Sequence, residues 1–582
     1  MLIRMITGEE GMHVRLLDFS EIQHGGDILN RLQLNFQRLH QAEYLPSQVF
    51  VGDASEWPGD KEGRLLLALV LLSRALHLDA AHAHEIFVAW PDHLNCKGYF
   101  GPTIDNVINE QQWSGNSWAI RGLIEYYLWT GNDKSINMVE DMVHNLYLPA
   151  AGKIRTYPVS LKDRTRAGGV GGHLTGACTN GWLTSTDIGC VFIALDGLTH
   201  AQSVLQMAPL QRLIEEMIDT LGATDIVACS FQTHATLSAL RGILRYSAIS
   251  RDSRFVDVAK SLYQLYMGQA LTETYANYNW FDRPAWTEPC AVIDSLLAAL
   301  ELWRVENNPQ YLEDAHHIYY NGLVHGQRPN GGFGCDCCVG SAGSTLHPQE
   351  VFEATFCCTM RGGEGLSRLS TYHYAVNQHS LYLNFFGDHD AQLRVENDLL
   401  SVRQSSTYPN DGFVQLEVLN TSTTGVIRFC FFCPSWIARD SVRILVNDRP
   451  HNVAFENGFA QVQLIAARGD VITYTFDIGL RTVPVLNSSH ASDLVTLRHG
   501  SLILGVQESE AVNARVGNHG WKRTDNGYEC EGPVMRLLPL NSLTYLSMKE
   551  ARKSRVQVLF RREPSVARDV TGNKRDENPY GP

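Results

Sequence analysis

Six of the thirteen cysteines in the sequence fall between Cys290 and Cys358, and a carboxylate, Glu288, lies two residues before the first of them. Cysteines cluster for disulfide formation, for metal binding, or for nucleophilic and redox chemistry. We rank disulfides lowest, because the N-terminal sequence shows no secretory signal. Glu288 and Cys290, with the vicinal pair Cys357 and Cys358, offer one oxygen and three sulfurs, a ligand set that suits zinc. The alternatives are buried inert cysteines or a purely structural zinc, and spacing alone does not establish that the two motifs meet.

Length and composition indicate a multidomain globular protein. The chain has 582 residues, a hydrophobic fraction of 44% and a charged fraction of 19%, which allows two or more domains with sizeable cores. The net charge is −14 and no basic tract is present, which argues against nucleic acid or an anionic membrane as a partner. No apolar run reaches the roughly 18 residues of a membrane span. We therefore expect a cytoplasmic protein with reduced thiols.

Hydrophobic periodicity divides the chain into a helical part and a β-rich part. Helical patterns recur between residues 27 and 324, in roughly a dozen segments with no strand runs between them. The segment 63–75 is apolar nearly all round, as an inner helix of a layered barrel would be. From about residue 370, strand-length runs alternate apolar and polar residues between turn signals.

We therefore expect an α/α toroid, an (α/α)6 barrel, followed by an antiparallel β-sandwich. The predicted boundaries are an N-terminal segment that contributes a strand to the β domain, the catalytic barrel, the sandwich and a polar tail, at residues 1–20, 21–370, 371–562 and 563–582.

Two further patterns bear on chemistry. Pro289 fits the first turn of a helix, which would place Cys290 near the positive end of that helix and favour its thiolate. The glycine-rich stretch 167–176 does not follow a strand or open a helix in a βαβ unit, so it fails the context test for a dinucleotide site.

Together these motifs resemble the β-L-arabinofuranosidases of glycoside hydrolase family 127 and their relatives. The resemblance covers about residues 15 to 510. It rests on the helical-then-β order and on short motifs, namely Glu62-Gly63-Arg64, His234-Ala235-Thr236-Leu237, Glu288-x-Cys290, Cys357-Cys358 and the segment 498–505. It implies a zinc-dependent retaining glycoside hydrolase that removes a terminal furanose or a related small sugar from an oligosaccharide or glycoside. The sequence leaves open whether the protein forms a homodimer.

The resemblance also implies residue roles. Cys357 would be the nucleophile and a zinc ligand together with Glu288, Cys290 and Cys358. Glu273, fifteen residues before Glu288, would be the acid/base. Desolvation by nearby aromatic residues would raise the pKa of Glu273 to suit that role. The expected substrate contacts are His234, Trp286 and Arg361, and a substrate carboxylate would pair with Arg361, Arg283 or Arg121.

The sequence departs from the family pattern around the sugar pocket. Thr359-Met360-Arg361 follows the cysteine pair where the family commonly has Pro-Pro-Asn, and Asn116-Ser117-Trp118 replaces an expected histidine. Cys335, Cys337 and Cys338 are not part of the family pattern. Two other functions therefore remain as alternatives to the zinc-dependent glycoside hydrolase. One is another α/α-toroid carbohydrate enzyme, such as a lyase or uronyl hydrolase, with a structural zinc. The other is a non-catalytic carbohydrate-binding protein.

Overall fold

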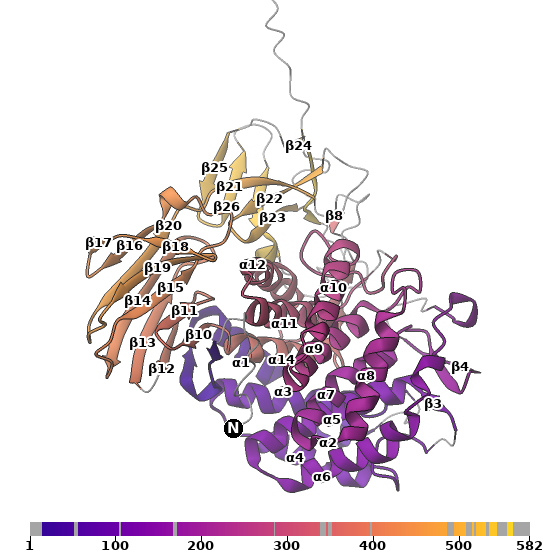
Figure 1. Ribbon diagram of the computed structural model, residues 1–582. Helices are drawn as coiled ribbons and strands as arrows, with labels where there is room; N and C mark the ends of the chain where they lie inside the picture. The colour runs from indigo at the N-terminus through magenta and orange to yellow at the C-terminus, as the bar shows by residue number, and fades with distance from the viewer. Residues whose placement is uncertain are drawn as a thin grey trace, which may run out of the picture.

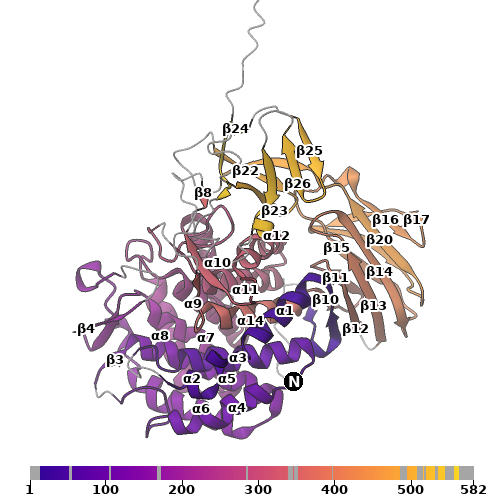
Figure 2. The same cartoon turned by 180° about the vertical axis from the view of Figure 1, so that it is seen from behind.

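The computed structural model describes thirteen stretches of the chain, at residues 14–51, 56–103, 106–166, 172–283, 286–337, 345–346, 352–395, 398–485, 494–507, 515–516, 520–530, 535–543 and 556–562. The predicted polar tail, residues 1–13, Cys338 and residues 167–171 of the glycine-rich stretch lie outside them. Figures 1 and 2 show the helices gathered in one half of the molecule and most of the strands in the other.

A closed ring of helices forms the centre of the helical part. Within the described residues, each of six helices packs against the next and the last packs against the first. In ring order they are α3 (Asp60–Leu76), α5 (Glu110–Thr130), α7 (Ala194–Leu205), α9 (Thr233–Ser250), α11 (Pro289–Glu306) and α14 (Cys358–Ser370). Because both sides of these helices are covered, they are apolar or buried nearly all round, as the sequence of α3 predicted.

A second set of helices covers the ring from outside. Each packs on one or two inner helices; in α8 the buried residues recur at helical spacing from Leu210 to Leu221, so that this helix buries one face. The outer helices are α1 (Gly26–Arg38), α4 (Ala81–Ala89), α6 (Asp133–Met142), α8 (Ala208–Gly222), α10 (Arg254–Gln269) and α12 (Pro309–His317). Short helices α2 (Pro46–Val49) and α13 (Val324–Gly326) lie in the connections.

Close packing of α3 against α5 depends on Gly63. A Cβ at this position would lie 2.1 Å from the backbone carbon of Trp118, so only glycine allows the two helices to approach so closely. The approach brings the next residue, Arg64, over the ring of Trp118 at 4.1 Å. The Glu62-Gly63-Arg64 motif thus sets the position of a buried arginine.

Two sheets make up the first part of the β region, drawn in orange in Figure 1. One has the order β1-β10-β11-β15-β19-β18 and the other β17-β16-β20-β14-β13-β12-β2. The N-terminal strands β1 and β2 each join one of these sheets at an edge. The strands of the first sheet are β1 (Arg15–Leu16), β10 (Tyr374–Asn377), β11 (Ser380–Leu383), β15 (Ile427–Phe432), β18 (Ala454–Glu456) and β19 (Phe459–Leu464). Those of the second are β2 (Ile22–His24), β12 (His389–Val395), β13 (Asp398–Ser406), β14 (Gly412–Thr421), β16 (Arg443–Val446), β17 (Arg449–His451) and β20 (Val471–Phe476).

A third sheet follows in the chain and lies at the top of Figure 1, in yellow. Part of its core is an apolar cluster separate from the main one, with Leu497, Leu504 and Phe560 among its residues. The sequence predicted one sandwich for residues 371–562, and that boundary stays a prediction, but the described strands of this range lie in three sheets. The strands of the third sheet are β8 (Thr345–Leu346), β21 (Leu480–Pro484), β22 (Leu494–His499), β23 (Leu502–Gln507), β24 (Arg515–Val516), β25 (Trp521–Thr524), β26 (Gly527–Cys530), β27 (Arg536–Pro539), β28 (Val556–Gln557) and β29 (Phe560–Arg562).

Two small sheets lie within the helical part. One joins β3 (Ile108–Asn109), β4 (Leu174–Thr179) and β5 (Trp182–Ser185). The other has β7 (Gly334–Cys337) in its centre, between β6 (Trp286–Thr287) and β9 (Phe352–Glu353). The prediction of a helical part followed by a β-rich part is confirmed. Within the described residues, no helix is both long and apolar enough to cross a membrane.

Candidate metal and catalytic centre

The four predicted ligands come together in space. One ligand atom from each of Glu288, Cys290, Cys357 and Cys358 lies within 4.8 Å of all the others. The Sγ atom of Cys290 is 3.3 Å from that of Cys357 and 3.6 Å from that of Cys358, and Glu288 Oε1 is 3.7 Å from Cys357 Sγ. The two motifs that sequence spacing could not join are therefore one cluster of three sulfurs and a carboxylate.

Two helix N-termini and the β6-β7-β9 sheet position this cluster. Strand β6 runs directly into Glu288, which is the N-cap residue of α11, and Cys290 lies in the first turn. Strand β9 is followed by a turn that ends at Cys357, the N-cap residue of α14, with Cys358 as the first helical residue. Because helix N-termini carry partial positive charge, two of them pointing at one cluster favour anionic ligands.

Cys357 differs from the other three residues in exposure and charge. It alone is partly exposed, while Glu288, Cys290 and Cys358 are buried. Hydrogen bonds from Cys290 and Cys358 lower the pKa of Cys357 well below its ordinary value, and the positive charge of Arg64 acts in the same direction. Burial raises the pKa of Cys290 and of Cys358. Cys357 is thus both the most anionic and the most accessible sulfur of the cluster.

Arg64 is a buried cation beside the sulfurs that the sequence analysis noted only as part of a motif. It is 4% exposed, and its guanidinium donates a hydrogen bond to Cys290 Sγ at 3.3 Å. Asp60, one turn earlier on α3, pairs with the same guanidinium at 2.7 Å. A guanidinium held in this way offsets negative charge on the sulfurs without binding a metal itself.

His234 lies next to Arg64 at the start of α9. Its Nδ1 is 2.7 Å from Asp294 Oδ2, and its Nε2 is 3.4 Å from the Arg64 guanidinium. Burial lowers the pKa of His234, so we assign the neutral ring, which donates from Nδ1 and accepts at Nε2. Both nitrogens therefore have partners within the protein, and its predicted contact with the sugar stays a prediction.

Next to His234, a network of buried charged side chains joins the inner helices. Asp294 pairs with Arg241 at 2.7 Å and with Arg361, and Glu364 pairs with Arg241 at 2.9 Å as well as with Arg361 and Arg121. Arg361 and Arg121 are each 1% exposed. The structure thus places Arg361, predicted to contact the sugar, among acidic residues of the core, where its charge is already matched.

Glu273 lies in a tight loop beside β6. The loop closes through hydrogen bonds between Thr272 and Ala276, and the Thr287 hydroxyl ties it to the end of β6 by donating to Asn277 O at 3.0 Å. Glu273 itself is 8% exposed. The loop therefore lies next to the strand that leads into Glu288, while its role as acid/base stays a prediction.

A second buried carboxylate, Asp187, was not singled out by the sequence. It accepts hydrogen bonds from Trp280 Nε1 at 3.0 Å and from Gln232 at 3.2 Å. Burial raises the pKa of Asp187 to about 6, and the negative charge of Cys357 adds to this effect. Asp187 follows a short strand without any recognisable motif, so no signal in the sequence marked it.

The other predicted residues surround the cluster. Trp286 is partly exposed on β6, opposite Cys337 on β7. The Arg283 guanidinium lies 4.1 Å from the centre of the Trp280 ring, and the same Trp280 donates a hydrogen bond to Asp187. Of the extra cysteines, Cys335 lies beside Cys358, with their sulfurs 4.0 Å apart.

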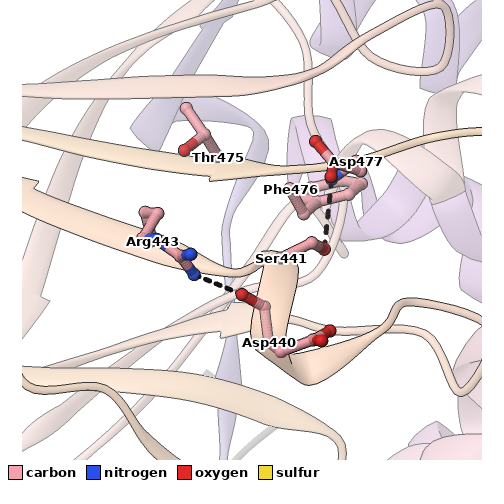
Figure 3. Close-up of a pocket in the computed structure, with 6 residues that line it drawn as sticks. All are labelled: Asp440, Ser441, Arg443, Thr475, Phe476 and Asp477. Carbon is pink, nitrogen blue, oxygen red and sulfur yellow. Dashed lines mark hydrogen bonds between the residues drawn. The ribbon is translucent and has the colours of Figure 1, made fainter.

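A hollow lies on the β region, away from this centre. It has a volume of about 390 Å³ and is lined by Asp440, Ser441, Arg443, Thr475, Phe476 and Asp477 (Figure 3). Its polar groups bind one another: Arg443 donates to Asp440 O, and the backbone N–H of Asp477 donates to Ser441 Oγ at 3.2 Å. We assign no ligand to it.

The fold, with its charged centre at one end of a helical ring, invites comparison with carbohydrate-active enzymes. A family model described as the middle domain of β-L-arabinofuranosidase, GH127, matches residues 380–478 and indicates a glycoside hydrolase. A GH127 β-arabinofuranosidase structure is 14% identical and has a TM-score of 0.70, with 95% of this chain and 99% of that chain covered. A GH127 β-L-arabinofuranosidase from Geobacillus stearothermophilus T6 is 13% identical, with a TM-score of 0.65 and coverage of 95% and 100%. No curated protein matches the sequence.

These comparisons confirm the predicted resemblance to family 127. The family model falls on the two orange sheets of Figure 1, and the solved structures share the fold over nearly the whole chain. The enzyme class predicted from the sequence, glycoside hydrolase, is thereby confirmed.

Arg64→Gln tests the part that the buried arginine plays. We expect the variant to fold and to hold a metal about 10- to 100-fold more weakly, as is typical when an outer partner of a ligand is lost. The metal affinity of Arg64→Lys should lie between those of the unmodified protein and Arg64→Gln, because lysine keeps the positive charge but lacks the planar guanidinium group. Competition with a chelator measures the affinity, and Arg74→Gln on the outer end of α3 is the control. An unchanged affinity in Arg64→Gln would show that Arg64 only packs against Trp118.

Proposed function

We propose that this protein is a zinc-dependent retaining glycoside hydrolase in which Cys357 is the nucleophile. The helical ring would be the inner layer of an (α/α)6 barrel, and the first two sheets would form the β-sandwich. The observation that carries the proposal is that Cys357 is the one partly exposed member of an otherwise buried sulfur and carboxylate cluster. The substrate would be a terminal furanose similar to β-L-arabinofuranose, or a related small sugar, on an oligosaccharide or glycoside.

The cluster fits zinc in donor chemistry and spacing. Sulfurs bound to one tetrahedral zinc at about 2.3 Å lie about 3.8 Å apart, and the sulfur pairs within the cluster lie 3.3 to 3.9 Å apart. Glu288 Oε2 is buried without a hydrogen-bond partner, which costs free energy unless a cation is near. Glu288, Cys290, Cys357 and Cys358 would hold the ion, and zinc would keep the sulfurs deprotonated at neutral pH.

The chain's own residues then supply two chemical steps. In the first, the Cys357 thiolate attacks the anomeric carbon, a C–S bond forms, and the bond to the leaving oxygen breaks as Glu273 protonates that oxygen. In the second, Glu273 takes a proton from water, the water oxygen attacks the anomeric carbon, and the thiolate leaves. Two inversions give net retention. The neighbouring helix N-termini and Arg64 stabilise the thiolate as attacking and as leaving group.

The zinc content of the protein should depend on the ligand cysteines. We expect about one zinc per purified chain, and we expect Cys290→Ala and Cys358→Ala to lose it, because each removes a buried thiolate ligand. Elemental analysis measures the zinc. Cys430→Ala, which changes a buried cysteine on β15, should keep it. Zinc that persists in both ligand variants would contradict the assignment.

Activity on an aryl furanoside, with and without chelator, tests the function. Cleavage that stops when zinc is removed from a protein that remains folded supports the proposal. Cleavage that survives metal removal would instead favour a carboxylate mechanism with a structural zinc. Turnover of uronides alone would favour a lyase or uronyl hydrolase, and binding without turnover of any glycoside would favour a carbohydrate-binding protein.

A further inference from the structure

A fourth sulfur lies just outside the ligand cluster. Cys335 is 3% exposed, and its Sγ is 4.0 Å from Cys358 Sγ, close to the spacing of about 3.8 Å expected for two sulfurs on one zinc. It nevertheless falls outside the group whose ligand atoms all lie within 4.8 Å of one another. Cys335 therefore lies beside one proposed ligand, Cys358, but it does not complete the set of four.

The β6-β7-β9 sheet fixes Cys335 in this place. Strands β6 and β7 pair antiparallel, with Trp286 opposite Cys337 and Thr287 opposite Asp336. The next step of this register puts Cys335 opposite Glu288, itself a proposed ligand. On its other side Cys335 pairs with Phe352 of β9, the strand that leads toward Cys357. The central strand of the sheet thus carries a cysteine between the two segments that supply the ligands.

The proposed reaction creates a need for such a residue. When Cys357 bonds to the sugar, its sulfur becomes a thioether, which has no negative charge and is a poorer metal ligand than a thiolate. Glu288, Cys290 and Cys358 would then be left with one coordination position open. Glu288 Oε2 is buried without a hydrogen-bond partner, so a cation at this place would offset the cost of its burial whatever Cys357 does.

We propose that Cys335 is a reserve ligand that occupies the position of Cys357 while Cys357 is bonded to the sugar. Cys335 would hold the ion as a thiolate, with its proton passing to water, and would take a proton back when Cys357 returns. No oxidation or reduction is involved. The inference rests on the proposed metal site and nucleophile, and it explains a cysteine that the family pattern lacks.

Removing Cys357 imitates the loss of its thiolate without any sugar. We expect Cys335→Ser alone and Cys357→Ala alone each to keep about one zinc per chain, and Cys335→Ser/Cys357→Ala to lose it. In cobalt-substituted protein, thiolate-to-metal absorption should stay at the unmodified level in Cys357→Ala, because Cys335 replaces the missing sulfur. Cys430→Ser/Cys357→Ala is the matched control and should keep its zinc. Circular dichroism checks that each variant is folded.

The outcomes separate the inference from the function on which it rests. Loss of zinc in folded Cys357→Ala, or retention in the double variant with Cys335→Ser, would overturn the reserve ligand while leaving the nucleophile in place. Loss of zinc in Cys335→Ser alone would make Cys335 a permanent ligand and overturn the inference as well. An unmodified protein without zinc would contradict the proposed metal site itself.

Discussion

Cys357→Ser should lose turnover by more than about 10⁴-fold, the scale seen when an enzyme loses its nucleophile. A serine hydroxyl has no comparable anion at neutral pH, and it is a poor zinc ligand. The loss should appear in kcat for every substrate, including aryl glycosides with good leaving groups, because the step that fails is formation of the bond to the anomeric carbon. Steady-state kinetics on an aryl furanoside measure it.

Two controls accompany Cys357→Ser: its zinc content and the activity of Cys335→Ser. If Cys357→Ser keeps its zinc and its fold, the loss belongs to the nucleophile and not to the metal site. Cys335→Ser, which changes a sulfur beside Cys358 but leaves Cys357 in place, should retain far more activity. Activity in Cys357→Ser within tenfold of the unmodified protein would exclude Cys357 as the nucleophile.

Glu273→Gln should slow the cleavage of natural glycosides by roughly 10² to 10⁴-fold, the usual range for loss of a general acid–base group. The loss should be smaller for an aryl glycoside, because a good leaving group needs little protonation. Added azide should accelerate the second step of the variant, because an anionic nucleophile needs no general base. Kinetics on paired substrates with poor and good leaving groups measure the difference.

Asp187→Asn is the matched comparison for Glu273→Gln. Both carboxylates are buried, but Asp187 accepts hydrogen bonds from Trp280 and Gln232 and is held in place by them. If Asp187 only positions the sugar, its substitution should slow the cleavage of natural glycosides and of aryl glycosides equally. A leaving-group dependence in Asp187→Asn, together with equal losses in Glu273→Gln, would assign the acid/base role to Asp187 and contradict our assignment.

Much of the architecture could be predicted because it follows from local periodicity. Segment 63–75 is apolar nearly all round, which predicted an inner helix, and the alternating strands after residue 370 predicted the β region. The candidate metal cluster was predictable from residue types, because few other roles bring a carboxylate and three cysteines into two short motifs. The helix start at Pro289 also followed from the sequence, whereas the meeting of this N-terminus with that of α14 did not.

The surroundings of the cluster depend on contacts between distant segments, which no local pattern records. Arg64 reaches Cys290 only because Gly63 lets α3 approach α5, and the closure of the ring then brings α3 toward α11. Asp187 reaches Trp280 and Gln232 from a loop with no motif. Arg361 had a charge that suited a sugar carboxylate, but the sequence could not show that Asp294 and Glu364 already match it.

Covalent labelling tests the central claim most directly. An L-arabinofuranosyl haloacetamide or epoxide, followed by peptide mass spectrometry, reports which residue reaches the anomeric position. We predict a single label on Cys357 that substrate blocks, and a product released with retained anomeric configuration. A label on Glu273 or Glu288, or a product of inverted configuration, would contradict the cysteine mechanism and leave the zinc a structural role.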